Sequence, residues 1–202
     1  MHISEGILST PVLISGAVIT IAGTAAGLKK MSNEQIPQTA ILSAVFFVGS
    51  LIHVPIGPSS VHLILNGLLG VLLGWAAYPA ILVALFLQAL LFQYGGFTSL
   101  GVNGATMAVP AIVCFLVFKK GVMSRNRSLM LLSSFLCGAL SIFLSAILAA
   151  TALVFTGEAF WGVAKVLVAA HIPIMIIEGL ISVFCIQFLK RVKPEILEVI
   201  YD

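Results

Sequence analysis

The sequence predicts an all-α membrane protein, a polytopic helical bundle with about seven transmembrane segments. Of its 202 residues, 60% are hydrophobic and only 8% are charged, whereas soluble domains carry roughly a quarter charged residues. A water-soluble core of this length cannot hide so much apolar surface. The apolar runs do not alternate with polar residues as transmembrane strands would, so we expect helices.

Short polar breaks divide the chain into the expected segments. They cover residues 8–28, 39–54, 60–74, 77–94, 104–118, 129–155 and 161–189. Because a spanning helix needs about 20 residues, the third and fifth segments are short, and we expect them to be tilted, half-embedded or shielded by neighbours. The chain 1–202 is predicted to be a single transmembrane domain without a soluble domain.

The positions of the basic residues predict how the bundle is oriented. Nine of the ten basic residues follow the first, fifth and seventh segments, with Lys165 as the exception. These nine are Lys29, Lys30, Lys119, Lys120, Arg125, Arg127, Lys190, Arg191 and Lys193. Because basic residues concentrate on the cytoplasmic side of membranes, we expect the amino terminus outside and the carboxy terminus in the cytoplasm.

That orientation gathers several outer stretches beside the amino terminus. They are "HVPIGPSSVH" (53–62), "YGGFTSLGVNG" (94–104) and "TGEAFW" (156–161). The first two are rich in Gly, Pro and Ser, which indicate irregular backbone. A composite site on the outer surface is therefore predicted from topology.

The first two residues, Met1 and His2, carry a chelating group. We expect Met1 to stay, because initiator methionine is normally trimmed only before small residues. Its free amine, the His2 amide nitrogen and the His2 Nδ1 atom can close two fused chelate rings around one metal. Three nitrogens in a plane favour Ni(II), Cu(II) or Co(II) over tetrahedral zinc. The plainer interpretation is that His2 is an interfacial polar residue.

A planar site needs a fourth ligand, and the outer loop offers His53 and His62. Asn66 follows His62 by four residues, which predicts an amide on the same helical face. His62 is slightly favoured, because a helix start fixes the direction of a side chain better than a loop does. Either histidine remains a candidate, although each one taken alone is more simply explained as a hydrogen-bonded interfacial residue.

Two ionisable residues, His171 and Glu178, lie two turns apart on one face of the seventh segment. Ionisable groups at membrane depth generally face protein or water. The pair therefore predicts a second metal site, a proton relay, or a polar lock between helices or subunits. Gln88, Gln93 and Asn103 are further polar groups that either orient ligands or join helices.

The sequence does not favour an enzyme. It contains no paired carboxylates, no GxSxG and no HExxH motif, and no GxxxxGK[ST] nucleotide-binding loop. If ATP drives transport, another chain must hydrolyse it. Cys114, Cys137 and Cys185 lie in apolar runs without CxxC spacing and are expected to be small core residues. No basic patch interleaved with aromatics indicates nucleic-acid binding.

Four ordered motifs resemble one known family. "MHISEGIL", "VPIGPSSVHLILNGLLGVLLG", "LFQYGGFTSLGVN" and "HIPIMIIEGL" are similar to stretches of the CbiM/NikM family, the substrate-specific components of cobalt and nickel energy-coupling factor transporters. The resemblance covers residues 1–190. It implies seven spans with an extracellular amino terminus, in the cytoplasmic membrane of a prokaryote.

The resemblance also implies a site for Co²⁺ or Ni²⁺ as the transported ion. Its ligands would be the Met1 amine, the His2 amide and imidazole nitrogens, and His62. His53 departs from the family pattern and is expected either to support the ligands from behind or to be peripheral. Thr98 and Asn103 are expected to support the site from a covering loop. The resemblance assigns no role to the pair of ionisable residues in the seventh segment.

The partners implied are a transmembrane coupling subunit and two ATP-binding-cassette ATPases, and a small accessory membrane subunit accompanies many cobalt members. A self-sufficient secondary metal-ion or metal–proton carrier is the alternative, with His171 and Glu178 as its relay. The sequence does not choose between cobalt and nickel. "GPSSVHLILNGL" (57–68) leans slightly toward the cobalt-type members.

Overall fold

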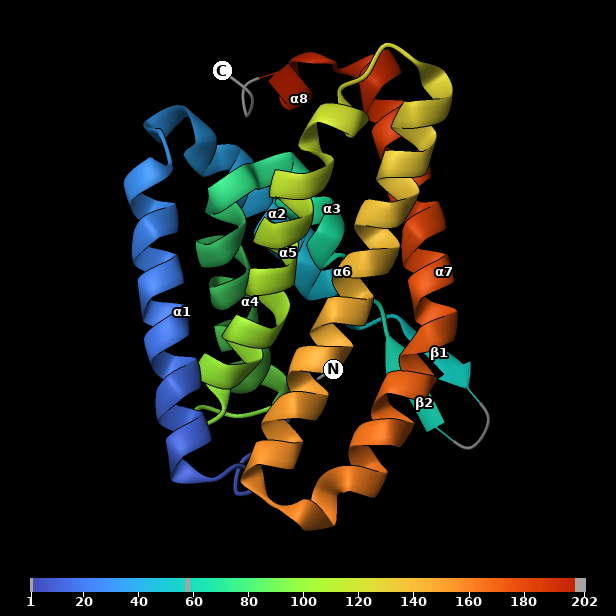
Figure 1. Cartoon of the computed structure of the whole chain (residues 1–202). Coiled ribbons are helices and arrows are strands. Elements are labelled where there is room, and N and C mark those ends of the chain that lie inside the picture. Colours follow the sequence, from blue (N-terminus) through green and yellow to red (C-terminus); the bar gives the residue numbers. More distant parts are fainter. Residues whose placement is uncertain (1, 57–58, 199–202) are drawn as a thin grey trace.

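The computed structural model describes residues 2–56 and 59–198, except for the side chains of residues 53–56, 59–61 and 198. These residues form a helical bundle with one short β-hairpin (Figure 1). The α-helices are α1 (Thr10–Lys30), α2 (Ile36–Gly49), α3 (Asn66–Leu73), α4 (Ala77–Phe92), α5 (Leu100–Val122), α6 (Arg127–Thr156), α7 (Trp161–Val192) and α8 (Glu195–Glu198). Three 3₁₀ turns are η1 (Asn33–Gln35), η2 (Gly74–Ala76) and η3 (Glu158–Phe160).

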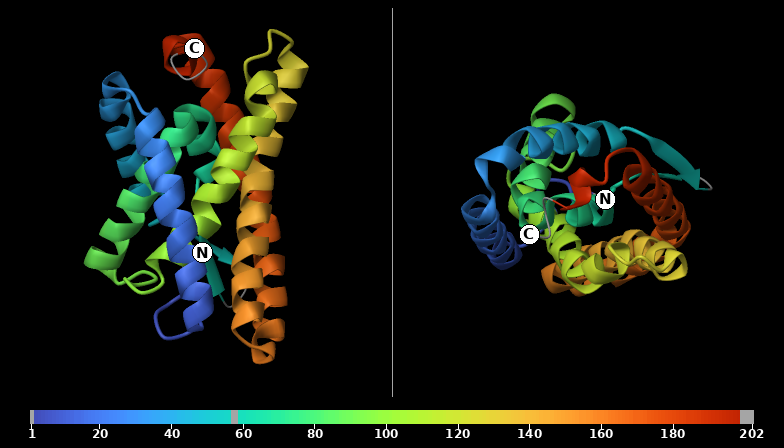
Figure 2. Two further views of the ribbon diagram at one scale, coloured as in Figure 1. Left: turned by 60° about the vertical axis from the view of Figure 1, so that its left-hand side comes forward. Right: turned by 90° about the horizontal axis from the view of Figure 1, so that it is seen from above.

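The hairpin consists of β1 (His53–Ile56) and β2 (Ser59–His62), which pair antiparallel. In register, His53 is the partner of His62. Seen along the bundle axis, the hairpin projects beyond the helices (Figure 2). It occupies the stretch where only an irregular outer loop was expected.

The residues at the ends of the helices explain where α1 and α6 begin and where α1 ends. α1 begins after Ser9 with a proline in its first turn, where the missing N–H costs nothing, and it ends with Lys29 and Lys30. Basic side chains stabilise the negative end of the helix dipole. α6 begins at the cap residue Asn126, whose side chain accepts hydrogen bonds from the N–H groups of Ser128 and Leu129.

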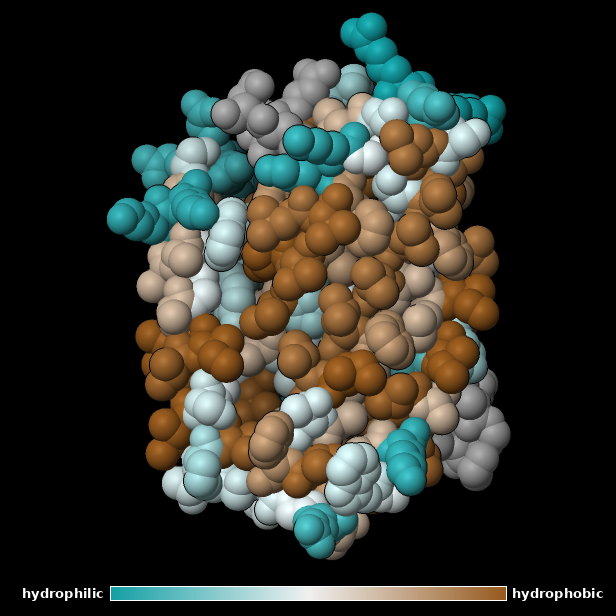
Figure 3. Space-filling view, in the orientation of Figure 1, coloured by the Kyte–Doolittle hydropathy of each residue, from teal (hydrophilic) through white to brown (hydrophobic). Residues whose placement is uncertain are grey.

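Five helical stretches among the described residues are long and apolar enough to cross a membrane. Four contain the single helices α1, α5, α6 and α7, and the fifth is the stretch Asn66–Phe92. Figure 3 shows hydrophobic side chains across the middle of one face and hydrophilic side chains toward both ends. The prediction of a helical membrane protein is confirmed, while the seven crossings and the sides of the two termini stay predictions.

The fifth stretch is divided by a reversal of the chain at Gly74, which has φ of 55°. Gln38, near the start of α2, donates to the Leu72 carbonyl at the end of α3. Ser43, further along α2, donates to the Ala80 carbonyl in α4. α3 is therefore antiparallel to α2, and α4 is parallel to α2. With eight residues, α3 is only about 12 Å long and cannot cross a membrane alone.

The predicted segment at 60–74 was wrong in its bounds. The structure divides it into β2, a break at residues 63–65 and α3. Leu65 has φ of 59°, a left-handed conformation that a helix cannot contain. The fifth segment, predicted at 104–118, is longer as α5, because Lys119 and Lys120 fit in its last turn. Long basic side chains reach out to the interface without ending the helix.

α3 is buried on every side, and all eight of its residues are buried. It packs against α5 and α6 through two glycines. A Cβ at Gly70 would overlap the Ala111 carbonyl of α5, and one at Gly67 would overlap Ser141 and the Cys137 carbonyl of α6. The absence of side chains at these two positions lets the half-helix lie between the longer helices.

We predict that Gly70→Ala lowers the stability of the fold by about 1–3 kcal/mol, the usual cost of overpacking a core. The methyl group would meet backbone atoms of α5, which cannot turn away as a flexible side chain would. Thermal unfolding in detergent measures the effect. Gly162→Ala is the matched control, because nothing lies within 4 Å of the added methyl, and alanine there should be neutral or slightly stabilising. Equal melting temperatures for the two variants would contradict this packing.

Candidate metal centre

The segment before α1 is held inside the bundle by Asn103 of α5. The Ile3 N–H donates to Asn103 Oδ1 at 2.9 Å, and Asn103 Nδ2 donates to the Ile3 carbonyl at 3.1 Å. Ile3 is 5% exposed and Asn103 is 2% exposed. One side-chain amide therefore satisfies both backbone groups of a buried residue, as a neighbouring strand would.

The loop before α5 closes over this segment. Gly95 has φ of 75°, and a Cβ there would lie 2.5 Å from Asn103 Nδ2 and 3.5 Å from the Cβ of His2. The Thr98 N–H donates to Glu5 Oε1 at 2.8 Å. Thr98 itself is exposed and contacts the amino-terminal segment through its backbone. The loop around Thr98 therefore lies against the amino-terminal segment, and Asn103 makes two hydrogen bonds with that segment. Support of a metal by Thr98 and Asn103 stays a prediction.

The ring of His2 is oriented by a directional chain of hydrogen bonds. The Ser50 hydroxyl donates to the Phe47 carbonyl at 2.7 Å, so Ser50 accepts the Gln88 Nε2–H, also at 2.7 Å. Gln88 Oε1 then faces His2 Nε2 at 2.7 Å. Because an amide oxygen only accepts, this pairing assigns the ring proton to Nε2 and leaves Nδ1 with its lone pair.

His62 lies beside His2. Their ring centroids are 4.9 Å apart, and the ring of Tyr94 lies 5.7 Å from that of His2. His62 Nδ1 is 2.8 Å from the Leu63 carbonyl, a contact that assigns the proton to Nδ1. Metal-binding histidines commonly donate their second ring nitrogen to a carbonyl in this way.

Burial lowers the pKa of His2 to about 3. A lowered pKa means that the folded protein favours the neutral imidazole, because charging it would remove a cation from water. The ring therefore needs to lose no proton to bind a metal at neutral pH. A cavity of about 180 Å³ reaches His2 from between α6 and α7, and Ser4, Leu153, Phe160 and Leu167 line it.

Glu178 holds the backbone that follows His62. Its Oε1 atom accepts hydrogen bonds from the Ile64 and Leu65 N–H groups, and its Oε2 lies 2.9 Å from the Leu65 nitrogen. Glu178 is 1% exposed. These bonds tie α7 to the connection between β2 and α3. Of the three interpretations given for Glu178, the structure supports the polar lock.

The remaining candidates are placed differently. Asn66 begins α3 whereas His62 ends β2, so the expected shared helical face was wrong. The Asn66 amide instead donates to the Met107 carbonyl and to Ser145 Oγ. His171 lies in α7 with Nδ1 bonded to the Leu167 carbonyl. The side chain of His53 and all of Met1 lie outside the described residues.

Among the residues whose side chains the structure describes, no group of three or more His, Cys, Asp or Glu side chains could hold a metal ion. His2 and His62 are two imidazoles that the structure brings side by side. Ser50 and Tyr94 were not predicted as parts of the site, because neither residue type marks a ligand. Gln88 was noted only as one of several polar groups near the outer half.

Known proteins are similar to this chain over most of its length. The family model for the cobalt uptake substrate-specific transmembrane region, CbiM, matches residues 2–196. A putative metal transport protein from Haemophilus influenzae is 42% identical, over 98% of this chain and 97% of its own length. A cobalt transport protein CbiM from Kyrpidia tusciae is 31% identical, over 98% and 86%.

A crystal structure described as a transition metal transporter superposes with a TM-score of 0.77 at 29% identity, over 95% of this chain and 93% of that one. Fused nickel transport proteins are also similar, and the putative one from Archaeoglobus fulgidus is 26% identical over 98% of this chain and 68% of its own length. The family model spans nearly the whole chain, including His2, His62 and Asn103. The chain therefore belongs to the CbiM family.

Proposed function

We propose that this protein is the substrate-binding membrane subunit of an energy-coupling factor importer for Co²⁺ or Ni²⁺, and that it captures the ion at its amino terminus. The observation that carries the proposal is that half-buried His2 lies beside buried His62, with ring centroids 4.9 Å apart. Each ring has its proton assigned to one nitrogen by a fixed hydrogen bond. The names of the relatives, which mention cobalt and nickel transport, support the choice of ion.

The proposed donors are four nitrogen atoms. The Met1 amine and the His2 amide nitrogen close a five-membered ring, and the His2 amide and Nδ1 close a six-membered ring. His62 Nε2 supplies the fourth donor. A planar set of nitrogens that includes a deprotonated amide suits Ni(II) and Co(II). Because three donors belong to two adjacent residues, little entropy is lost in assembling the site.

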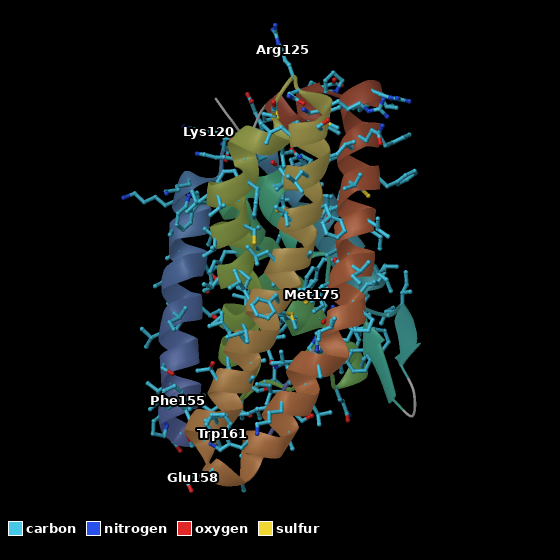
Figure 4. All side chains as sticks on the ribbon, turned by 45° about the vertical axis from the view of Figure 1, so that its right-hand side comes forward. Lys120, Arg125, Phe155, Glu158, Trp161 and Met175 are labelled. Atoms are coloured by element: carbon cyan, nitrogen blue, oxygen red, sulfur yellow. The ribbon has the colours of Figure 1, made fainter. Side chains whose placement is uncertain are left out.

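The proposed orientation places the site outside and the basic end in the cytoplasm. Figure 4 shows Lys120 and Arg125 at the end of the bundle opposite Glu158 and Trp161. The ends of α1 and α7 carry Lys29, Lys30, Lys190 and Arg191. A basic end of this kind faces the cytoplasm in membrane proteins. We propose that a coupling subunit and two ATPases act there, in the cytoplasmic membrane of a prokaryote, with an accessory membrane subunit as in many cobalt systems.

Extending the chain by one residue before Met1 should abolish metal binding. The added residue converts the Met1 amine into an amide, which removes one donor and the ring that it closes. Isothermal titration with Ni²⁺ in detergent should show a loss of affinity of at least about 100-fold, as expected for a lost ligand and its chelate ring. One residue added after Asp202 is the matched control, and it should bind as the natural chain does. Equal affinity of both variants would exclude the amine as a donor.

The affinity should fall steeply in acid, with protons released by the amine and the amide. His2 contributes none near neutral pH, because its pKa is about 3. Below the amine pKa of about 8, two protons leave on binding. The apparent affinity should therefore fall by at least about 100-fold per pH unit. Titrations at several pH values, in buffers of different ionisation enthalpy, count the protons. A pH-independent affinity would contradict the donor set.

Transport should require ATP and the partner subunits. In proteoliposomes, the chain alone should take up no ⁵⁷Co²⁺ under a proton or cation gradient. Adding a coupling subunit and two ATPases of a CbiM-type transporter, with ATP, should give uptake, and a non-hydrolysable ATP analogue should not. Gradient-driven uptake by the chain alone would instead support a self-sufficient secondary carrier.

A further inference from the structure

Two buried polar atoms in the interior, His171 Nε2 and Asn66 Oδ1, have no hydrogen-bond partner in the described part of the chain. His171 is 5% exposed and Asn66 is fully buried. Buried polar groups are rarely left without a partner, and each exception calls for an explanation such as a water or an ion.

Both atoms present lone pairs. The His171 Nδ1 atom lies 2.7 Å from the Leu167 carbonyl, which assigns the proton to Nδ1 and leaves Nε2 as an acceptor. The Asn66 NH₂ group donates to the Met107 carbonyl at 2.8 Å and to Ser145 Oγ at 2.9 Å, so Oδ1 is the acceptor. Two acceptors cannot satisfy each other. Each of them needs a hydrogen-bond donor or a cation as its partner.

The helix register brings the two residues to the same depth. α6 and α7 are antiparallel, and a Cβ at Gly138 of α6 would touch the Glu178 carbonyl of α7. Ser145 follows Gly138 by seven residues in α6, and His171 precedes Glu178 by seven residues in α7. Because the helices are antiparallel, both steps lead toward the same end of the bundle. Seven residues are two turns, about 10.5 Å, in both helices. Ser145 of α6 therefore lies level with His171, and Asn66 donates to Ser145.

This level is deeper than the amino-terminal site. Leu167 lines the cavity that reaches His2, and His171 lies one turn further along α7. One turn beyond His171, Met175 lies about midway between the two ends of the bundle (Figure 4). A cation leaving the amino-terminal nitrogens for the other end of the bundle would meet this level first.

We propose that His171 Nε2 and Asn66 Oδ1, beside Ser145 Oγ, form a second and weaker site for a divalent first-row cation. Imidazole nitrogen and neutral oxygen donors accept such ions. They provide no anionic donor, so they bind less tightly than a site that contains a deprotonated amide. A weak site suits an ion in transit. Its place on the inward path rests on the proposed function, whereas the existence of the site does not.

The test is Co²⁺ alone, applied to the full chain in detergent. Titration should show one tight equivalent and a second one at least 100-fold weaker. His171→Ala should remove only the weak equivalent. Ser182→Ala is the matched control, because its hydroxyl on α7 is also buried and unpartnered but lies three turns deeper, and it should keep both. His62→Ala should lose the tight equivalent and keep the weak one. The His62 variant therefore tests the proposed function, and the His171 variant tests the second site.

Crystals of the natural chain soaked in Co²⁺ give a test without any variant. Anomalous diffraction should show a peak within bonding distance of His171 Nε2, about 2.0–2.2 Å. A water there without anomalous signal, or a single binding equivalent in the natural chain, would overturn the proposal. So would a His171→Ala variant that still binds the weak equivalent.

Discussion

Everything at this site depends on holding the first residues of the chain inside an apolar bundle. A buried backbone N–H or carbonyl without a partner costs about 1–3 kcal/mol. The Asn103 side chain provides partners for both groups of Ile3. The glycine at position 95 allows the covering loop to approach that pair closely. With Ile3 fixed, His2 is placed beside His62, and its ring orientation follows from Gln88.

Hydrogen bonds within the protein fix which nitrogen of each imidazole carries the proton. For His2, the direction runs from the Phe47 carbonyl through Ser50 and Gln88 to Nε2. For His62, the Leu63 carbonyl does the same at Nδ1. Glu178 holds the following two residues from α7. The two histidines are therefore positioned by residues of α2, α4, α5 and α7, and a shift of α7 would move the backbone next to His62. If the proposed function holds, such a shift offers a physical route from movement of the bundle to release of the ion.

Composition and charge placement predicted the helical bundle and the end at which the basic residues gather, because both depend on properties summed over many residues. The hairpin at 53–62 and the break before Asn66 could not be predicted. The break is held by Glu178, which lies more than a hundred positions away and supplies hydrogen bonds that a local pattern does not reveal. The pairing of His2 with His62 was reached through the family resemblance, since the residues alone favoured His62 over His53 only slightly. Gln88 looked like any other polar residue in an apolar helix until its partner was known.

The most direct measurement is whether the nitrogen of Met1 binds the metal. With ¹⁵N confined to methionine, the only methionine nitrogen that is an amine is that of Met1, and Cu²⁺ serves as a paramagnetic probe of the site. Electron–nuclear double resonance on the copper-loaded protein should show a strongly coupled ¹⁵N nucleus in place of one ¹⁴N. A spectrum identical to that of the unlabelled protein would show that the amino terminus is not a ligand, and would contradict the account.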